Sequence, residues 1–371
     1  MLTGRLAAKC PQPFGSAAVF ATPDIKMTSD RSESSPIAVR RVAGSLCVVI
    51  PVYNEAVGLP ELHRRLAAAF DALTQRSEVI YVNDGSADQS LVVLRQLAAQ
   101  DARVTVLNLS RNFGKEVALS AGLDHAEADV VVVMDADLQH PPESIPVMLE
   151  EWGGGAEVVL MRRTNREEEG WLKKTTAKLF YRFLRRISEL EIPENIGDFR
   201  LMSRQVVLAV RSFPERTRFM KGLMAWPGYR HSVLEYYHDL RHAGRTKWNY
   251  WRLWNLALEG ITSFSTVPLK ASTYIGFATA ATAFVYAAVI LARTILWGDQ
   301  VRGFPTLIVV ILFLGGMQLM VLGIIGEYIA RMFVEVKRRP LYLLDGAYRR
   351  SPDGGGVVDV AAELPRARLV P

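Results

Sequence analysis

The sequence is poor in cysteine, with only Cys10 and Cys47 among 371 residues. Because the two lie far apart and in different contexts, neither a disulfide framework nor a zinc site is supported. The first 43 residues also lack the early, continuous apolar run of a signal peptide. They are rich in Ser, Pro, Ala and Arg, and we predict that residues 1–43 form a disordered N-terminal extension. The alternative is that the start of the sequence is assigned too far upstream.

Charge is limited as well, at 22% of the chain, whereas 50% of the residues are hydrophobic. The mean hydropathy of +0.11 is high for a soluble enzyme and low for a protein made mostly of membrane spans. A soluble domain joined to a few spans fits this value. The formal net charge of +6 favours anionic partners, which include nucleic acid, lipid headgroups and phosphorylated substrates.

Short β-branched runs alternate with helix-like segments from Leu46 onward. The expected strands are LCVVIPVY, VIYVNDGS, VTVLNL and VVVVMDAD, and the expected helices span residues 59–73, 90–99 and 116–125. This alternation predicts an α/β fold with parallel strands and crossover helices. Ligands of such sheets bind beyond the carboxyl ends of the strands. The polar residues at those ends are Asn54, Asp84, Asn112 and Asp135.

Two long apolar stretches, residues 274–297 and 306–329, follow this domain. Each has about the 20 residues that cross a bilayer, and the short connector WGDQVRGFP makes them a hairpin. Basic residues flank the hairpin at Lys270, Arg331 and 337–339. The positive-inside rule therefore predicts a multi-pass protein of the inner cell membrane, with the α/β domain and both termini in the cytoplasm. The alternative is a pair of buried core helices.

Aromatic and basic residues precede the hairpin in WNYWRLWNLALEGITSFS. This pattern predicts an amphipathic helix at the membrane interface, with an ordinary surface helix as the alternative. The tail beyond Asp345 is rich in Gly, Pro and Arg, and we predict that it is disordered. The expected boundaries are 1–43 for the extension, 44–245 for the α/β domain, 246–269 for juxtamembrane helices, 270–333 for the hairpin and 334–371 for a cytoplasmic tail.

Asp135 and Asp137 leave the last expected strand with one residue between them. Two carboxylates at this spacing present hard oxygen ligands, which suit Mg²⁺ or Mn²⁺. The metal would bridge a diphosphate and stabilise the negative charge of a departing nucleotide. An Asp at a strand end is often only part of a turn, but the arrangement of the four strands favours the metal site.

Three further loop motifs follow the earlier strands: PVYNE at 51–55, NDGSAD at 83–88 and SRNFGK at 110–115. A carboxylate in the first two would accept hydrogen bonds from a base or ribose, and Gly85 would let the backbone approach a ligand closely. Cations of the third would meet phosphate. The alternatives are plain strand-to-helix turns, with Asp88 near a helix start, and a solvated loop.

The motifs PVYNE, NDGSADQS, LSRNFGKEVALSAGLDHA and MDADLQHPP together resemble glycosyltransferase family 2. More narrowly, they resemble the branch that contains dolichol-phosphate mannose synthase and the bactoprenol glucosyltransferases. The resemblance continues through IGDFRLMSR, KGLMAWPGY, AGRTKWNYWRLWNLALEGITSFSTVPLK and GEYIARMFVEVKRRP, and covers roughly residues 46–342. It implies a GT-A nucleotide-sugar-binding domain, an interfacial helix and a two-helix transmembrane hairpin.

The resemblance also implies roles for individual residues. The nucleotide pocket would be lined by Pro51, Tyr53, Glu55 and Asp84, with Lys115 near the base or ribose. Asp135 and Asp137 would hold the metal and the diphosphate, with support from Gln139. Asp198 would face the donor sugar or the acceptor, and Arg200 would bind phosphate. The lipid phosphate would lie near Arg162, Arg163, Lys173 and Lys174, whose alternative is a solvated charged segment.

Two positions depart from the family pattern. His140 stands where Asp is frequent after the Gln, which casts little doubt on metal binding. In the segment GRTKW, Arg245 stands where the family often has an acidic residue before Thr-Lys, so the contact made at this position stays open.

The implied reaction is an inverting, in-line transfer of a hexose from a nucleotide-diphosphate sugar to a polyprenyl phosphate such as undecaprenyl phosphate. The resemblance favours a UDP-sugar over a GDP-sugar as the donor. The lipid phosphate oxygen is already ionised at neutral pH, so no strong general base is required. Catalysis would rest on positioning and on stabilisation of the departing diphosphate by metal and arginine. The identity of the sugar is not readable from the sequence.

Other functions fit the sequence less well. A polysaccharide synthase of the same family usually carries a Q-x-x-R-W motif, which is absent here. A non-catalytic membrane scaffold would not need Asp135, Asp137 and Arg200. A nucleic-acid partner is not expected, because the basic residues cluster near membrane-facing segments. Oligomeric state stays open: related enzymes include tetramers, and GMQLMVLGIIG is either a small-residue packing face or a flexible span.

Overall fold

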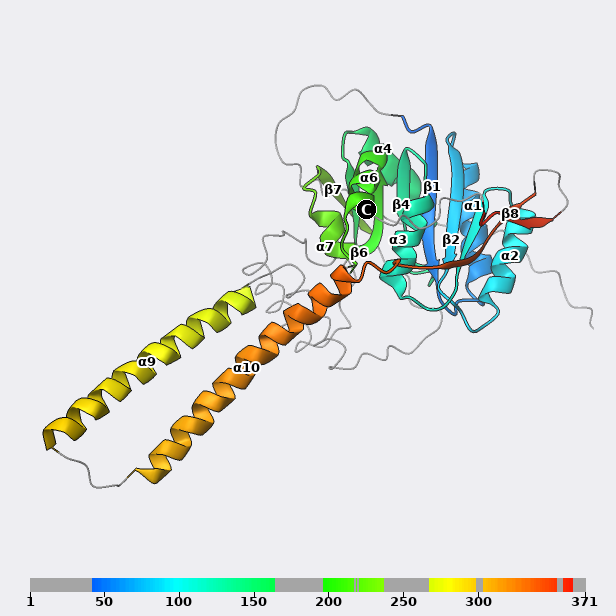
Figure 1. The fold of residues 1–371 in the computed structure, drawn as a ribbon. Helices are drawn as coiled ribbons and strands as arrows, with labels where there is room; N and C mark the ends of the chain where they lie inside the picture. Colours follow the sequence, from blue (N-terminus) through cyan, green and yellow to red (C-terminus); the bar gives the residue numbers. More distant parts are fainter. Residues whose placement is uncertain are drawn as a thin grey trace, which may run out of the picture.

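Among the residues that the structure describes, nine strands form a mixed sheet, and a hairpin of two long helices extends from it (Figure 1). The structure is a computed structural model that describes residues 42–163, 196–216, 218, 220–236, 267–297, 303–351 and 356–362. The predicted juxtamembrane helices of residues 246–269 lie almost wholly outside these described residues, as do Lys173, Lys174 and Arg245.

The strands follow the order β7-β5-β6-β4-β1-β2-β3-β8-β9 across the sheet. Their bounds are β1 Ser45–Val52, β2 Arg76–Asn83, β3 Val104–Leu109, β4 Val130–Val133, β5 Val158–Arg163, β6 Ile196–Ser203, β7 His231–Tyr236, β8 Leu344–Arg350 and β9 Val357–Asp359. Strands β4, β1, β2 and β3 are parallel, which confirms the predicted α/β sheet. Strand β6 runs antiparallel to both β4 and β5, and β8 runs antiparallel to β3.

Helices cover both faces of this sheet. Their bounds are α1 Leu59–Asp71, α2 Ser90–Gln100, α3 Lys115–His125, the 3₁₀ turn η1 Pro142–Ser144, α4 Ile145–Gly153, α6 Arg204–Ser212 and α7 Met220–Ala225. The three predicted crossover helices are thus confirmed. One core joins α1, α2 and α4 to alternate strand residues such as Val48 and Ile50. The other joins α3, α6 and α7 to Cys47 and Val49.

Strands β1 to β4 are buried almost throughout because both faces of the sheet are covered. This explains why they read as continuous Val- and Ile-rich runs rather than as alternating patterns. The parallel directions bring the loops after β1, β2 and β4 to one edge of the sheet. That edge holds the candidate site described below.

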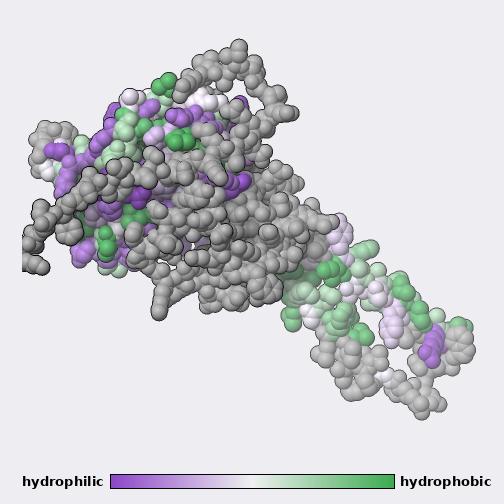
Figure 2. Space-filling model, turned by 180° about the vertical axis from the view of Figure 1, so that it is seen from behind, coloured by the Kyte–Doolittle hydropathy of each residue, from purple (hydrophilic) through white to green (hydrophobic). Residues whose placement is uncertain are grey.

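The hairpin consists of α9 Val267–Trp297 and α10 Phe304–Val336, which lie side by side (Figure 1). Many of their large apolar side chains are exposed, and Figure 2 shows this apolar surface. Across the described part of the chain, no helix is both long enough and apolar enough to cross a membrane. The bounds of α9 and α10 confirm that the two predicted apolar stretches form a pair of helices. That these helices cross a bilayer stays a prediction.

The chain returns to the sheet after the hairpin. Strand β8 pairs with β3, and β9 pairs with β8. The prediction that the tail beyond Asp345 is disordered is therefore wrong for residues 346–350 and 357–359. The physical reason is that β3 would otherwise leave its backbone groups unpaired at a sheet edge. Tyr342 and Ala347 are fully buried against the domain.

Candidate functional site

Two loops at the carboxyl edge of the sheet hold each other in place. After β1, the backbone of Asn54 adopts a left-handed conformation with φ of 56°. Its N–H donates to Ser86 Oγ at 3.0 Å, and its side-chain oxygen accepts from the N–H of Ala87 at 2.8 Å. The N–H of Glu55 donates to Ser90 Oγ at 3.0 Å. These contacts fix the loop after β1 against the loop after β2.

Asp84 fixes a third loop, residues 110–114. Only 2% of Asp84 is exposed, and its two carboxylate oxygens accept from the N–H groups of Phe113 at 2.7 Å and Gly114 at 3.0 Å. Burial raises the pKa of this carboxyl, although the two hydrogen bonds and the charge of Arg111 oppose that rise. The described contacts of Asp84 are therefore with the protein backbone, and its predicted role in the nucleotide pocket stays a prediction.

Gly85 allows this loop to lie directly on the strand end. Its φ is +63°, and a Cβ at this position would lie 2.4 Å from the backbone of Arg111 and Asn112. A side chain is excluded both by this close approach and by the positive φ. The sequence predicted that the backbone at Gly85 approaches a ligand closely. In the structure it approaches the backbone of Arg111 and Asn112 instead.

Lys115 begins α3 and lies between two carboxylates. Its Nζ is 2.7 Å from Asp135 Oδ1 and 2.5 Å from Asp198 Oδ2. Burial by itself lowers the pKa of Lys115, but the charges of Asp135 and Asp198 outweigh it and raise the pKa above the ordinary value. The lysine is therefore a cation at neutral pH. Its predicted place near a base or ribose stays untested, whereas its contact with these carboxylates is new.

The turn after β4 shapes the pair of carboxylates. Leu138 has a φ of 62°, and Asp137 Oδ1 accepts from the N–H of Gln139 at 3.1 Å. The N–H of Asp135 donates to His140 Nδ1 at 2.9 Å. The imidazole is buried and stacks on Phe199 at 4.9 Å between ring centroids. His140 thus orients the backbone of Asp135, a contact that no sequence motif indicates.

Arg200 lies on β6 with 4% of its surface exposed. One guanidinium nitrogen, Nη2, donates to the carbonyl oxygen of Gly197 at 3.0 Å. Burial lowers the pKa of Arg200, and the carboxylates of Asp198 and Glu116 oppose this effect. Its buried Nε finds no hydrogen-bond partner among the described residues. An anionic ligand near this nitrogen would supply one.

The other predicted site residues are spread more widely. Pro51 is buried within β1, Tyr53 is 49% exposed, and Glu55 is partly buried in the loop after β1. Arg162 lies on β5 with its Nη1 3.6 Å from Glu235 Oε1, and Arg163 ends that strand. The described contacts therefore join Lys115, Asp135 and Asp198 in one cluster, but they do not join Arg162 to it.

The carboxylate pair fits a divalent cation. In the residues that the structure describes, no group of three or more His, Cys, Asp or Glu side chains could hold a metal by itself. Mg²⁺ is commonly held by only one or two carboxylates and completes its shell with substrate phosphates and water. Asp135 and Asp137 supply hard oxygens of that kind, and the Lys115 ammonium, 2.7 Å from Asp135 Oδ1, would compete with a metal ion for that carboxylate.

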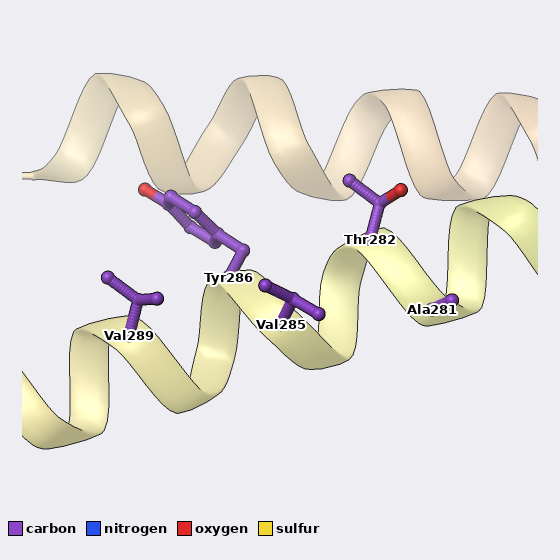
Figure 3. A pocket seen from close by; sticks show the side chains of 5 residues that line it. All are labelled: Ala281, Thr282, Val285, Tyr286 and Val289. Carbon is purple, nitrogen blue, oxygen red and sulfur yellow. The ribbon is translucent and has the colours of Figure 1, made fainter.

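An open groove of about 500 Å³ lies on the hairpin, away from the sheet. It is lined by Ala281, Thr282, Val285, Tyr286 and Val289. Figure 3 shows these side chains along α9, with Thr282 and Tyr286 pointing toward α10. The hydroxyl of Thr282 already donates to the carbonyl oxygen of Ala278 at 2.8 Å. The groove has no ionisable group suited to bind phosphate, so it does not replace the carboxylate cluster as the candidate site.

Comparison with known protein families matches two regions of the chain. Residues 47–210 match the model described as glycosyl transferase family 2, and residues 267–332 match the one described as the GtrB C-terminal hairpin. These regions correspond to most of the strand-rich domain and to the α9–α10 hairpin.

Three relatives are similar over most of their length. A bactoprenol glucosyl transferase from a prophage of Shigella flexneri is 47% identical, over 83% of this chain and 99% of the relative. A prophage bactoprenol glucosyl transferase homolog of Escherichia coli is 47% identical, over 81% and 98%. A Synechocystis protein named as an uncharacterized glycosyltransferase is 49% identical, over 81% and 94%.

Solved structures are more distant. The glucosyl-3-phosphoglycerate synthase of Mycobacterium tuberculosis, in complex with Mn²⁺, UDP and phosphoglyceric acid, is 19% identical with a TM-score of 0.41. The match covers 59% of this chain and 76% of that one.

Proposed function

Since the chain belongs to glycosyl transferase family 2, we propose that it transfers a hexose from a nucleotide-diphosphate sugar to a polyprenyl phosphate such as undecaprenyl phosphate. The cluster of Lys115, Asp135 and Asp198 beside Arg200 is the observation that carries this proposal. It combines the cations and carboxylates that a diphosphate and its metal ion need. The relatives named bactoprenol glucosyl transferases favour glucose as the sugar. We propose UDP as the nucleotide, which is what the family resemblance of the sequence motifs implies.

In the proposed reaction, an oxygen of the lipid phosphate attacks the anomeric carbon of the sugar. The new carbon–oxygen bond forms as the bond to the nucleotide diphosphate breaks, with inversion, and the electron pair leaves with that diphosphate. Because the attacking phosphate is already ionised, no residue has to remove a proton. Lys115 and Arg200 stabilise the charge that develops on the departing diphosphate, and Asp198 faces the sugar or acceptor.

Asp135 and Asp137 are proposed to hold Mg²⁺ or Mn²⁺, with Gln139 next to them. When bound, this ion would offset negative charge on the diphosphate. Pro51, Tyr53, Glu55 and Asp84 are the proposed nucleotide-pocket residues. Arg162, Arg163, Lys173 and Lys174 are proposed for the lipid phosphate; the ion pair of Arg162 with Glu235 would have to yield to that ligand.

The hairpin is proposed to hold the site at the cytoplasmic face of the inner membrane. Its exposed apolar side chains would face lipid or the hairpin of a second copy. Large apolar side chains are exposed on both helices, among them Phe277 and Phe284 on α9 and Phe313 and Leu319 on α10, whereas an ordinary surface exposes such residues singly. A polyprenyl chain stays in the bilayer, so an enzyme that modifies its phosphate must work at the membrane surface.

A transfer assay tests the proposal. Purified protein in lipid vesicles is given Mg²⁺ or Mn²⁺, undecaprenyl phosphate and one labelled donor at a time: UDP-glucose, UDP-galactose, UDP-N-acetylglucosamine or GDP-mannose. We expect label from UDP-glucose to enter the organic phase, and a chelator to stop it. If no donor labels the lipid while the protein binds nucleotide, the proposed acceptor is wrong.

A further inference from the structure

The segment after the hairpin reaches the core of the catalytic domain. Helix α10 ends at Val336, and Tyr342 is already only 1% exposed. The hydroxyl of Tyr342 donates to Asp124 Oδ2 at 3.1 Å. Asp124 lies near the end of α3, and Lys115 is the first residue of the same helix. The segment therefore contacts the helix that presents the site lysine.

The same segment also holds the loop that leads into α3. The N–H of Ser110, the first residue of this loop, donates to the carbonyl oxygen of Leu343 at 2.9 Å. Asn108 pairs with Gly346 and Leu109 with Leu344, so Asp345 is an extra residue at a bulge. Bulges commonly re-aim a side chain. Here Asp345 Oδ2 accepts from Asn108 Nδ2 at 3.0 Å.

The hydrogen bond between Asp345 and Asn108 continues through a buried pair of amides, Asn108 and Asn83, to the neighbouring strand β2. Asn83 Nδ2 donates to Asn108 Oδ1 at 2.7 Å, and the two residues are 2% and 5% exposed. Asn83 immediately precedes Asp84, whose carboxylate holds the N–H groups of Phe113 and Gly114. The loop of residues 110–114 is therefore held at its start by Leu343 and at its end by Asp84. Asp345 lies two residues after Leu343 and accepts from Asn108, which is bonded to Asn83 next to Asp84, so its carboxylate is linked to both ends of the loop.

We propose that residues 341–345, the C-terminal strap, position Lys115 and the 110–114 loop for the donor diphosphate. Asp345 and Tyr342 are the positioning residues of the strap. This inference rests on the proposed function, because it assumes that Lys115 meets a nucleotide diphosphate. Removing the Asp345 carboxylate leaves the buried amide of Asn108 without its acceptor, and such networks respond as a unit. A shift of about 1 Å in a group that binds the reacting part of a substrate is enough to weaken function strongly.

Four variants of the full-length protein test the strap. Asp345→Ala removes the acceptor, whereas Asp345→Asn keeps an oxygen in its place. Tyr342→Phe removes only the hydroxyl that binds Asp124. Arg350→Ala changes an exposed side chain of the same strand and is the matched control. For each, we would measure the Kd of UDP in Mg²⁺ by calorimetry, the KM for the sugar donor and for undecaprenyl phosphate, and the midpoint of thermal unfolding.

We expect Asp345→Ala to raise the UDP Kd and the donor KM about tenfold, equivalent to about 1.4 kcal/mol, without raising the KM for the lipid. Asp345→Asn and Arg350→Ala should stay within about twofold of the wild type. An unchanged UDP Kd in Asp345→Ala overturns the proposal. So does an equal loss in Asp345→Asn, because the acceptor oxygen would then not be what matters.

Tyr342→Phe decides the question if Asp345→Ala fails to fold, since it keeps the ring in the core. A raised UDP Kd in this variant at a wild-type unfolding midpoint supports the strap, and an unchanged Kd rejects it. A wild-type protein that binds UDP but labels no lipid would contradict the proposed function alone, because the UDP Kd still reports on the strap. A wild-type protein that binds no UDP would overturn both.

Discussion

Lys115 begins helix α3, and its ammonium lies between two carboxylates. Its motif SRNFGK suggested a cation for phosphate, and the family resemblance placed it near the base or ribose. The structure places its ammonium on Asp135 and Asp198, residues 20 and 83 positions further along the chain. Contacts over such separations depend on the packing of α3 against the sheet. Sequence spacing alone does not predict them.

Lys115→Met should separate metal binding from sugar transfer. Without the ammonium, we expect Mn²⁺ to bind the nucleotide-free protein about threefold to tenfold more tightly, because a repelling neighbouring charge is gone. Sugar transfer should fall about tenfold or more, because the departing diphosphate loses a stabilising cation. Electron paramagnetic resonance titration measures the first effect and the lipid-labelling assay measures the second.

Lys337→Met is the matched control, since this exposed lysine lies at the end of the hairpin. It should leave Mn²⁺ affinity at the wild-type value. Weaker Mn²⁺ binding in Lys115→Met would show that the lysine supports the metal site rather than competing with it.

His140 is a second residue whose contacts in the site were not predicted from the sequence. The resemblance marked it only as a departure from the family pattern. In the structure its Nδ1 accepts the N–H of Asp135, and its ring stacks on Phe199 from β6. The acceptor nitrogen carries no proton, so the imidazole is neutral in this arrangement. No pattern within a single sequence indicates such a contact, because it depends on β4 and β6 being neighbours in the sheet.

Helix α3 is the element that joins the site to the sheet. Ala118, Leu119, Ala121 and Leu123 are buried, and Gly122 lies so close to β1 that an added Cβ would be 2.3 Å from Val49 Cγ1. The small residue sets how near the helix approaches the strands. Since Lys115 begins this helix, its distance from Asp135 depends on that packing.

Gly122→Ala should therefore overpack the interface between α3 and the sheet. We expect it to lower the free energy of unfolding by about 1–3 kcal/mol, the usual cost of an added methyl group in a close-packed core. Chemical denaturation of the full-length protein measures the change. Gly58→Ala is the control, because its nearest neighbours would lie 3.7 Å or more from the new Cβ. Equal stability of the two variants would contradict this account of the helix.

Strand β8 shows why an element can escape prediction. Its buried positions are Gly346 and Ala347, which give no hydrophobic pattern, and its remaining residues include Arg349 and Arg350. The segment therefore resembles a loop in composition. What makes it a strand is the unpaired edge of β3, a tertiary feature from far earlier in the chain. The strands β1 to β4, by contrast, carry their own apolar signal and were predicted correctly.

At the scale of the whole molecule, the strap and β8 attach the hairpin to the catalytic domain. The sequence suggested a domain followed by a separate anchor and a loose tail. In the structure, Glu335 near the end of α10 accepts from the N–H of Arg216 at 2.9 and 3.0 Å, and β8 then extends the sheet. The hairpin is thus joined to the domain at both the helix end and the following strand.

Truncation tests this relation. Ending the chain after Lys337 removes the strap, β8 and β9 but leaves the hairpin, whereas ending it after Ala362 keeps all three. We expect the shorter protein to unfold at a temperature lower by about 5–10 °C, because it loses the buried Tyr342 and Ala347 and re-exposes the edge of β3. The longer truncation should match the wild type. Identical unfolding midpoints for the two would contradict a structural role for β8.

The central claim is that the carboxylates at the end of β4 support sugar transfer to a polyprenyl phosphate. The most direct measurement is the rate at which label from UDP-glucose enters undecaprenyl phosphate, with wild-type protein and Asp137→Ala compared in the same vesicles. We predict transfer by the wild type and a loss of about 100-fold or more in the variant, at an unchanged unfolding midpoint. A wild-type rate in Asp137→Ala would contradict the claim.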